Sequence, residues 1–145
     1  MRSVRNLMMW FVCLLLMADT VFGSALDSMD ERFEQRNYRR FLLPNGLKIL
    51  LVSDPTVRKA AASLTVGVGA MSDPEMHQGL AHYLEHMLFL GTEKYPEAGE
   101  YQQFVSNRGG YTNAYTAGDH TNYHFEIDPE HLDGALDRFA QFFTA

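Results

Sequence analysis

The sequence contains a single cysteine, Cys13, which lies inside an apolar run close to the N-terminus. If this run is removed during export, the remaining chain has no thiol, which excludes disulfides and thiol chemistry. The chain also lacks an excess of basic residues, because 12 Lys and Arg stand against 18 Asp and Glu, with a formal net charge of −6. Nucleic-acid binding needs a basic face, so no nucleic-acid partner is expected.

Long hydrophobic runs, internal repeats and low-complexity tracts are absent as well. The apolar run over residues 7–17 is well short of the roughly 20 residues that a membrane helix needs. Hydrophobic residues make up 46% and charged residues 21% of the 145 positions, which excludes disordered and collagen-like chains. The chain is therefore predicted to hold at most one globular domain.

The N-terminus has the three parts of a secretory signal peptide. Arg2 and Arg5 form a short basic start, the apolar run follows, and small residues occupy positions 23–25. We predict a signal peptide over residues 1–23, with cleavage after Gly23 or Ala25, and hence an exported protein. An uncleaved N-terminal anchor is the alternative, and a membrane is otherwise not expected as a partner.

Turn residues divide the rest of the chain into short strands and helices, after a polar leader over residues 24–37. Apolar, β-branched and aromatic stretches predict strands over residues 38–43, 47–53, 60–68, 111–117 and 122–127. Asn45-Gly46 predicts a hairpin between the first two strands.

Helices are predicted over residues 78–90, 98–107 and 129–143, the last beginning with Asp128 and Pro129. This order indicates an α+β fold, with an antiparallel sheet packed by helices. The last helix has an apolar stripe that needs a partner, so we expect the chain to be a piece of a larger domain.

The helix from Gln78 to Leu90 carries most of the chemistry. Nearly all of its residues are apolar, so we expect it to be buried on most sides. Its acidic and imidazole groups, His82, Glu85 and His86, fall within a sector of roughly 100°. The two histidines lie one turn apart, which lets both rings reach one ion.

Burying these groups costs free energy unless a ligand compensates for it. A buried carboxylate needs a hydrogen bond or a positive charge, which Zn²⁺ would supply while holding both imidazoles neutral. Zinc lowers the pKa of a bound water to about 7, and a neighbouring carboxylate can pass the proton of that water to a leaving amine. The cluster predicts a zinc site for peptide-bond hydrolysis; two core histidines hydrogen-bonded to Glu85 are the alternative.

These residues also carry a resemblance to a known family. The run His82-Tyr83-Leu84-Glu85-His86 matches the His-x-x-Glu-His motif of the inverted zincins. The wider stretch over residues 79–96 resembles the insulysin–pitrilysin branch of the M16 metallopeptidases. The resemblance extends to Asn113-Ala114 and covers residues 35–145.

The resemblance implies a role for each matching residue. His82 and His86 would bind one Zn²⁺, Glu85 would be the catalytic general base, and the third ligand would be a glutamate near position 163, beyond residue 145. Three nearer acidic residues do not match the family position and are rejected as ligands: Glu93, Glu97 and Glu100.

Members of the family have four homologous α+β domains in one long chain. Residues 38–145 are therefore expected to be the N-terminal part of the first M16 peptidase domain, with the remaining M16 domains as partners. The resemblance implies peptides and short unfolded chains as substrates. It also suggests a bacterial periplasm as the location, with secretion as the alternative.

Residues 109–116 resemble the family's edge strand beside the zinc, to which a substrate peptide adds as a further strand. The resemblance implies that Asn113 binds substrate through its side-chain amide and Ala114 through its main chain. The residues alone equally fit an ordinary buried strand with Asn at a bulge. Tyr111 and Tyr115 could line side-chain pockets, although strand aromatics more often belong to the core.

Two other functions remain open. A non-catalytic peptide-binding fragment or subunit of an M16 assembly fits if two histidines without the third ligand bind zinc weakly, and we expect the isolated fragment to be inactive. A structural or scavenging zinc protein is disfavoured, because structural sites often use Cys. His124 is expected to be packed or hydrogen-bonded rather than a ligand, and His77 to lie in a loop.

Overall fold

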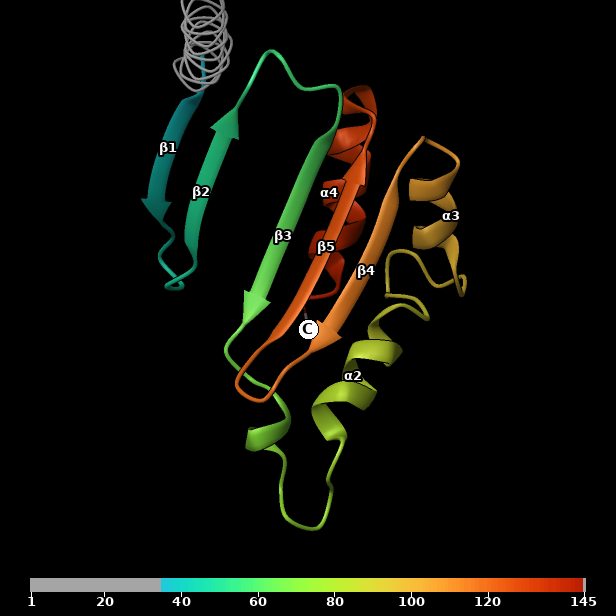
Figure 1. Ribbon diagram of the computed structural model, residues 1–145. Coiled ribbons are helices and arrows are strands. Elements are labelled where there is room, and N and C mark those ends of the chain that lie inside the picture. Colours follow the sequence, from blue (N-terminus) through green and yellow to red (C-terminus); the bar gives the residue numbers. More distant parts are fainter. Residues whose placement is uncertain (1–34, 145) are drawn as a thin grey trace, which may run out of the picture. The chain divides into compact units, whose positions relative to one another are not determined.

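The computed structural model describes residues 35–144, which divide between Val57 and Arg58 into two compact units (Figure 1). The predicted signal peptide, and all but the last three residues of the predicted leader, lie outside the described residues. No helix in the described part of the chain is long and apolar enough to cross a membrane.

The first unit contains the predicted hairpin. Strands β1 (Asn37–Leu42) and β2 (Lys48–Ser53) pair antiparallel, with Asn37 opposite Ser53. Gly46 has a φ of 87°, and the amide of Leu47 donates to Asn45 Oδ1 at 3.1 Å. Because this left-handed conformation favours glycine, the Asn45-Gly46 prediction is confirmed.

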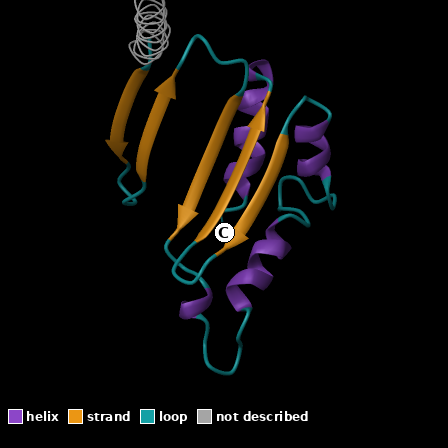
Figure 2. Ribbon diagram, in the orientation of Figure 1, coloured by secondary structure: helices purple, strands orange, loops and turns teal. Residues whose placement is uncertain are grey.

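The second unit is built on a three-stranded antiparallel sheet in the order β3-β5-β4 (Figure 2). Strand β3 covers Ala60–Val66, β4 covers Tyr111–Thr116 and β5 covers Thr121–Ile127. The central strand is β5, and within the described residues β4 pairs with no other strand. The sheet therefore presents β4 as an edge.

Three α-helices and two short 3₁₀ turns complete this unit. They are η1 (Ala70–Ser72), α2 (Leu80–Leu88), α3 (Glu100–Ser106), η2 (Pro129–His131) and α4 (Leu132–Gln141). The last predicted helix is thus a 3₁₀ turn followed by an α-helix. The sequence suggested that the Asp128 side chain caps this helix, and this is wrong: Asp128 precedes the turn but makes no side-chain capping hydrogen bond. Its carboxylate instead pairs with Lys59 Nζ at 2.7 Å.

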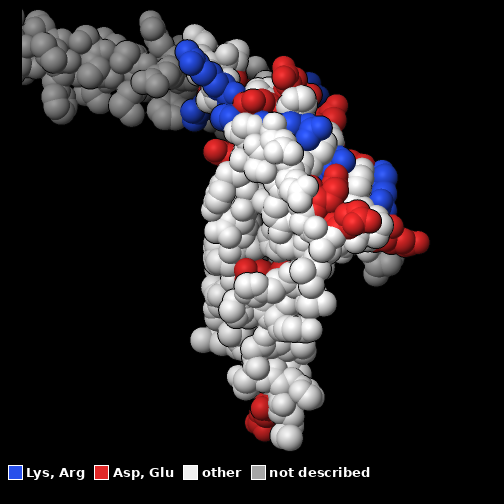
Figure 3. All heavy atoms as spheres, turned by 90° about the vertical axis from the view of Figure 1, so that its right-hand side faces the viewer, with Lys and Arg blue, Asp and Glu red and all other residues white. Residues whose placement is uncertain are grey.

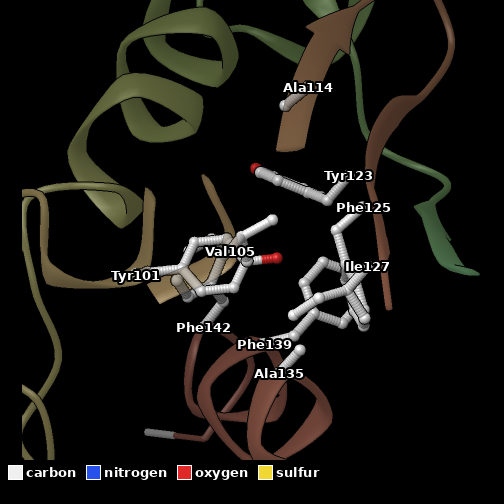
Figure 4. Packing of buried hydrophobic residues seen from close by; sticks show 9 residues of the cluster. All are labelled: Tyr101, Val105, Ala114, Tyr123, Phe125, Ile127, Ala135, Phe139 and Phe142. Carbon is white, nitrogen blue, oxygen red and sulfur yellow. The ribbon is translucent and has the colours of Figure 1, made fainter. Parts of the chain in front are cut away.

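The core lies between the sheet and helices α3 and α4. Alternate residues of β5, namely Tyr123, Phe125 and Ile127, are buried on the face that meets the helices. They pack with buried residues from the neighbouring elements (Figure 4), which are Tyr101, Val105, Ala114, Ala135, Phe139 and Phe142. The period-two pattern of β5 therefore fixes which face of the sheet the helices cover.

A polar network ties the loop after α2 to α4. Lys94 Nζ lies 2.7 Å from Asp137 Oδ2, and the Tyr95 hydroxyl donates to the same carboxylate. Arg138 stacks over the Tyr95 ring, 4.3 Å from its centroid, and pairs with Glu100 at 2.8 Å. These contacts fix the exit of α2 against the helical layer.

Candidate metal centre

Helix α2 is held at both ends by short-range features of the sequence. Gly79 precedes it with a φ of 89°, and the Asp73 carboxylate accepts hydrogen bonds from the amides of Gly79 (2.7 Å) and Ala81 (2.9 Å). These amides have no partner within the helix, so an acidic acceptor stabilises this end. Gly91 follows the helix with a φ of 144°, where a side chain would meet the carbonyl of Pro96.

The structure brings His82, Glu85 and His86 together on α2. The ring atoms His82 Nε2 and His86 Nε2 lie 3.0 Å apart, and the ring centroids lie 4.7 Å apart. The nearest ligand atoms of all three residues lie within 4.8 Å of one another. The two histidines are exposed, whereas Glu85 is buried at 7% exposure.

This donor set fits a zinc ion. Zn–N bonds of about 2.0–2.1 Å in a tetrahedral site place two nitrogens roughly 3.3 Å apart, so the rings are within a few tenths of an ångström of a ligand pair. Both imidazoles face water, which leaves room for further ligands. Imidazole nitrogens are among the ligands that zinc prefers, and a carboxylate close to them suits a catalytic zinc site.

The buried carboxylate of Glu85 is bonded across to β4. Thr116 Oγ1 donates to Glu85 Oε2 at 2.5 Å. Thr116 pairs in register with Thr121, whose hydroxyl donates to the carbonyl of Val68 at 2.8 Å. The charge of Glu85 also acts on the core, since burial and, secondarily, this carboxylate raise the pKa of the Tyr123 phenol.

A groove of about 440 Å³ lies between α2 and β4. It is lined by Ala70, Gly79, His82, Glu85, Ala114, Tyr115 and Thr116. Because it contains one histidine of the cluster and the carboxylate, a molecule in this groove would lie against the candidate metal centre.

The two residues predicted to bind substrate lie on β4, on opposite faces of the sheet. Ala114, which pairs in register with Tyr123 on β5, is buried and lines the groove. Asn113, which pairs in register with His124, is exposed. Both belong to the edge strand, as expected. The Asn113 side chain does not line the groove, so its predicted role stays a prediction.

The aromatic residues of β4 do not belong to the core. Tyr111 and Tyr115 are 52% and 49% exposed, so the interpretation of strand aromatics as core residues is wrong here. Their positions alternate with those that face the helices, which places them on the opposite side of the sheet. Tyr115 nevertheless reaches the groove, and Tyr111 packs against the His124 ring.

Helix α2 is far more exposed than its apolar sequence suggested. Only Glu85 is buried, whereas Tyr83 and Leu84 are 61% and 54% exposed, which corrects the expectation of burial on most sides. Within the described residues α2 packs against β4, β5 and η1, and its Tyr83 lies on the side that faces solvent. Figure 3, which views this side, shows charged side chains gathered towards α3 and few charges lower down, over α2.

The structure also places the other residues that the sequence analysis considered. None of the three rejected glutamates joins the cluster, and Glu100 is paired with Arg138. His124 Nδ1 forms a hydrogen bond with Asn122 Oδ1 at 3.1 Å, and His77 lies in a loop.

The sequence analysis missed two residues at the site. They are Asp73, which accepts hydrogen bonds at the start of α2, and Thr116, whose hydroxyl donates to Glu85. The role of Asp73 could have been predicted, because an acidic residue shortly before a helix that follows a glycine is well placed to accept hydrogen bonds from the first amides of the helix.

Comparison with known proteins agrees with this geometry. Residues 48–145 match the family model described as Insulinase (Peptidase family M16). The chain belongs to peptidase family M16. Its His82–His86 segment therefore corresponds to the His-x-x-Glu-His motif that inverted zincins share.

Relatives within M16 are much longer than this chain. The insulin-degrading enzyme of Bos taurus is 58% identical over 110 residues, which are 76% of this chain and 11% of that protein. The A-factor-processing enzyme of Saccharomyces cerevisiae is 52% identical over 119 residues, 82% of this chain and 12% of that protein. The chain thus spans about a ninth of the length of these relatives.

Solved M16-like structures show the same fold. The crystal structure of pitrilysin superimposes with a TM-score of 0.73 at 44% identity, over 75% of this chain and 12% of that chain. A protease from Helicobacter pylori gives a TM-score of 0.66 at 30% identity, over 73% and 25%. The predicted α+β class and the family resemblance are confirmed.

Proposed function

We propose that the chain carries the metal-binding and catalytic helix of a zinc-dependent endopeptidase that cleaves peptides and short unfolded chains. One observation carries this proposal: two imidazole nitrogens converge to 3.0 Å beside a buried carboxylate, on a helix that borders an open strand edge. Membership of family M16 supports the same activity.

The residues of α2 divide the work. His82 and His86 would hold the zinc through Nε2. When bound, zinc supplies Lewis-acid chemistry, polarising the scissile carbonyl and making water a better nucleophile. Glu85 would take the proton of the attacking water at Oε1, the oxygen that Thr116 does not bind, and deliver it to the leaving amine.

A substrate would bind along β4. An extended peptide that adds to this edge forms main-chain hydrogen bonds and lies beside the groove containing His82 and Glu85. Ala114 would contribute main-chain groups and Asn113 its side-chain amide. Main-chain pairing suits unfolded peptides, because folded proteins rarely offer a free strand.

Further parts of an M16 assembly would act as partners. The third zinc ligand is proposed to be a glutamate near position 163, and the remaining domains would add contacts to the substrate. The exposed apolar side chains of α2, including Leu80, Tyr83 and Leu84, support such a partner, because apolar surface of this kind is stabilised by being covered.

Export is proposed from the signal peptide over residues 1–23, with a periplasmic location or, alternatively, secretion. Family membership leaves the compartment open, since one Arabidopsis thaliana relative, 52% identical, is named as peroxisomal. Fractionation of cells that produce the tagged protein, with and without residues 1–23, tests this part: a tag that stays in the cytoplasm contradicts it.

The activity is tested by zinc content and cleavage measured together. We would determine bound zinc in this chain and in a longer polypeptide that continues past position 163, and follow a quenched fluorescent peptide with and without chelator. We expect about one zinc equivalent and chelator-sensitive cleavage only in the longer form.

Variants separate the roles. Glu85→Gln should keep the zinc and lose cleavage, His86→Ala should lose both, and His77→Ala is the matched histidine control that should change neither. One zinc equivalent in the 145-residue chain would mean that a local carboxylate completes the site. No zinc in either form would refute the metallopeptidase proposal.

A second candidate function is non-catalytic peptide binding. It is favoured by the described cluster itself, in which Glu85 is the only carboxylate beside the two histidines. Peptide binding that survives both chelation and Glu85→Gln, without cleavage in the longer polypeptide, would favour this candidate.

A further inference from the structure

We infer that Thr116 is a positioning residue for Glu85: its hydroxyl holds one carboxylate oxygen and leaves the other facing the groove. This inference deepens the proposed function and rests on it, because it concerns how the catalytic carboxylate is oriented.

Because Glu85 is buried, its carboxylate depends on the hydrogen bond from Thr116. The residue is 7% exposed, and a carboxylate at that depth must have a hydrogen-bond donor. Among residues 35–144 the only hydrogen bond to its carboxylate comes from Thr116 Oγ1 at 2.5 Å. That length is typical of a charge-assisted O–H···O⁻ bond, which is stronger than a bond between neutral groups.

The donor is itself held rigidly. Thr116 is the last residue of β4 and pairs in register with Thr121 on the central strand. Thr121 Oγ1 lies 3.4 Å from Thr116 Oγ1 and donates to the carbonyl of Val68 at 2.8 Å. A β-branched side chain has few χ1 choices, so the hydroxyl keeps its direction towards α2.

The bond fixes which oxygen can do chemistry. Oε2 is engaged with Thr116, whereas Oε1 has no protein partner in the described chain, and Glu85 lines the groove together with His82. A carboxylate fastened at one oxygen cannot rotate away from the groove. The hydroxyl therefore preorganises the general base through its hydrogen bond to Oε2.

Kinetics of the full polypeptide that shows cleavage test this role. Thr116→Val removes the hydroxyl but keeps the branched shape, and we expect kcat to fall about 10- to 100-fold, as for a misplaced catalytic group. KM and bound zinc should stay unchanged, and Thr116→Ser should recover kcat to within about threefold, since it restores the donor. Unchanged kcat in Thr116→Val, or no recovery in the serine variant, would overturn the inference.

A second measurement does not depend on activity and so separates this inference from the proposed function. In the 145-residue chain, unfolding of the wild type, Thr116→Val, Glu85→Leu and the double variant forms a thermodynamic cycle, because leucine leaves no acceptor for the Thr116 hydroxyl. We expect the two changes to be coupled by about tenfold in the unfolding equilibrium constant. Thr112→Val, which removes a hydroxyl bonded to the His124 carbonyl instead, is the control and should add independently to Glu85→Leu. Additive effects at Thr116 would refute the contact even if the protein proves to be a peptidase.

Discussion

Gly110 lies immediately before the edge strand, and replacing it with alanine should displace that strand. A Cβ at this position would lie 2.3 Å from the carbonyl oxygen of Glu126 and 2.7 Å from Val105 Cγ1. Ordinary contacts are about 3.5 Å or longer, so the neighbours would have to move by roughly 1 Å. Neither can do so easily, because Glu126 belongs to the central strand and Val105 is 0% exposed.

The expected loss lies at the upper end of the range for an overpacked core, about 3 kcal/mol. For a domain of this size that corresponds to a fall of about 10–20 °C in Tm, measured by circular dichroism. Gly67→Ala is the matched control, since nothing lies within 4 Å of its Cβ, and it should change stability by less than about 0.5 kcal/mol. A folded Gly110→Ala variant with the wild-type Tm would refute the reasoning.

Three further predictions concern the core and the start of α2. Burial raises the pKa of Tyr101 to about 12 from the usual tyrosine value of 10.0. The folded state therefore keeps the proton to higher pH than the unfolded state, and stability that is complete below pH 10 should fall by about 3 kcal/mol as the pH rises through 12. Urea unfolding at pH 9 to 12 checks this, and Tyr101→Phe should make the fall smaller by that amount. Asp73→Ala removes the acceptor for two amides of α2 and should cost about 1–2 kcal/mol in the same assay, with a smaller loss for Asp73→Asn. Phe125→Ala, at a side chain 1% exposed, should cost about 3–5 kcal/mol by chemical denaturation.

Local patterns in the sequence were enough for most elements of the fold. Asn45-Gly46 predicts the hairpin because its conformation depends on residues within the turn. The alternation in β5 and the one-turn spacing of His82 and His86 are equally local, so the strand and the histidine pair follow from the order of residues alone. The family resemblance rests on the same local motif.

Features that depend on how distant elements pack could not be predicted from local sequence patterns. The exposure of Leu84 depends on how completely the other elements cover α2, and the apolar sequence of the helix alone does not predict this. Propensity favoured the core over a side-chain pocket for Tyr115, but the alternation of β4 places Tyr115 on the face away from the helices. The bond from Thr116 to Glu85 joins residues 31 positions apart, and only the packed structure reveals it.

The open edge of β4 has a cost as well as a use. Its free main-chain groups do not distinguish a substrate peptide from the same strand of another copy of this chain, so the edge is also a template for self-association. Substrate and self-association therefore compete for one surface. A peptide that occupies β4 would keep one copy of this chain from pairing with another through that edge.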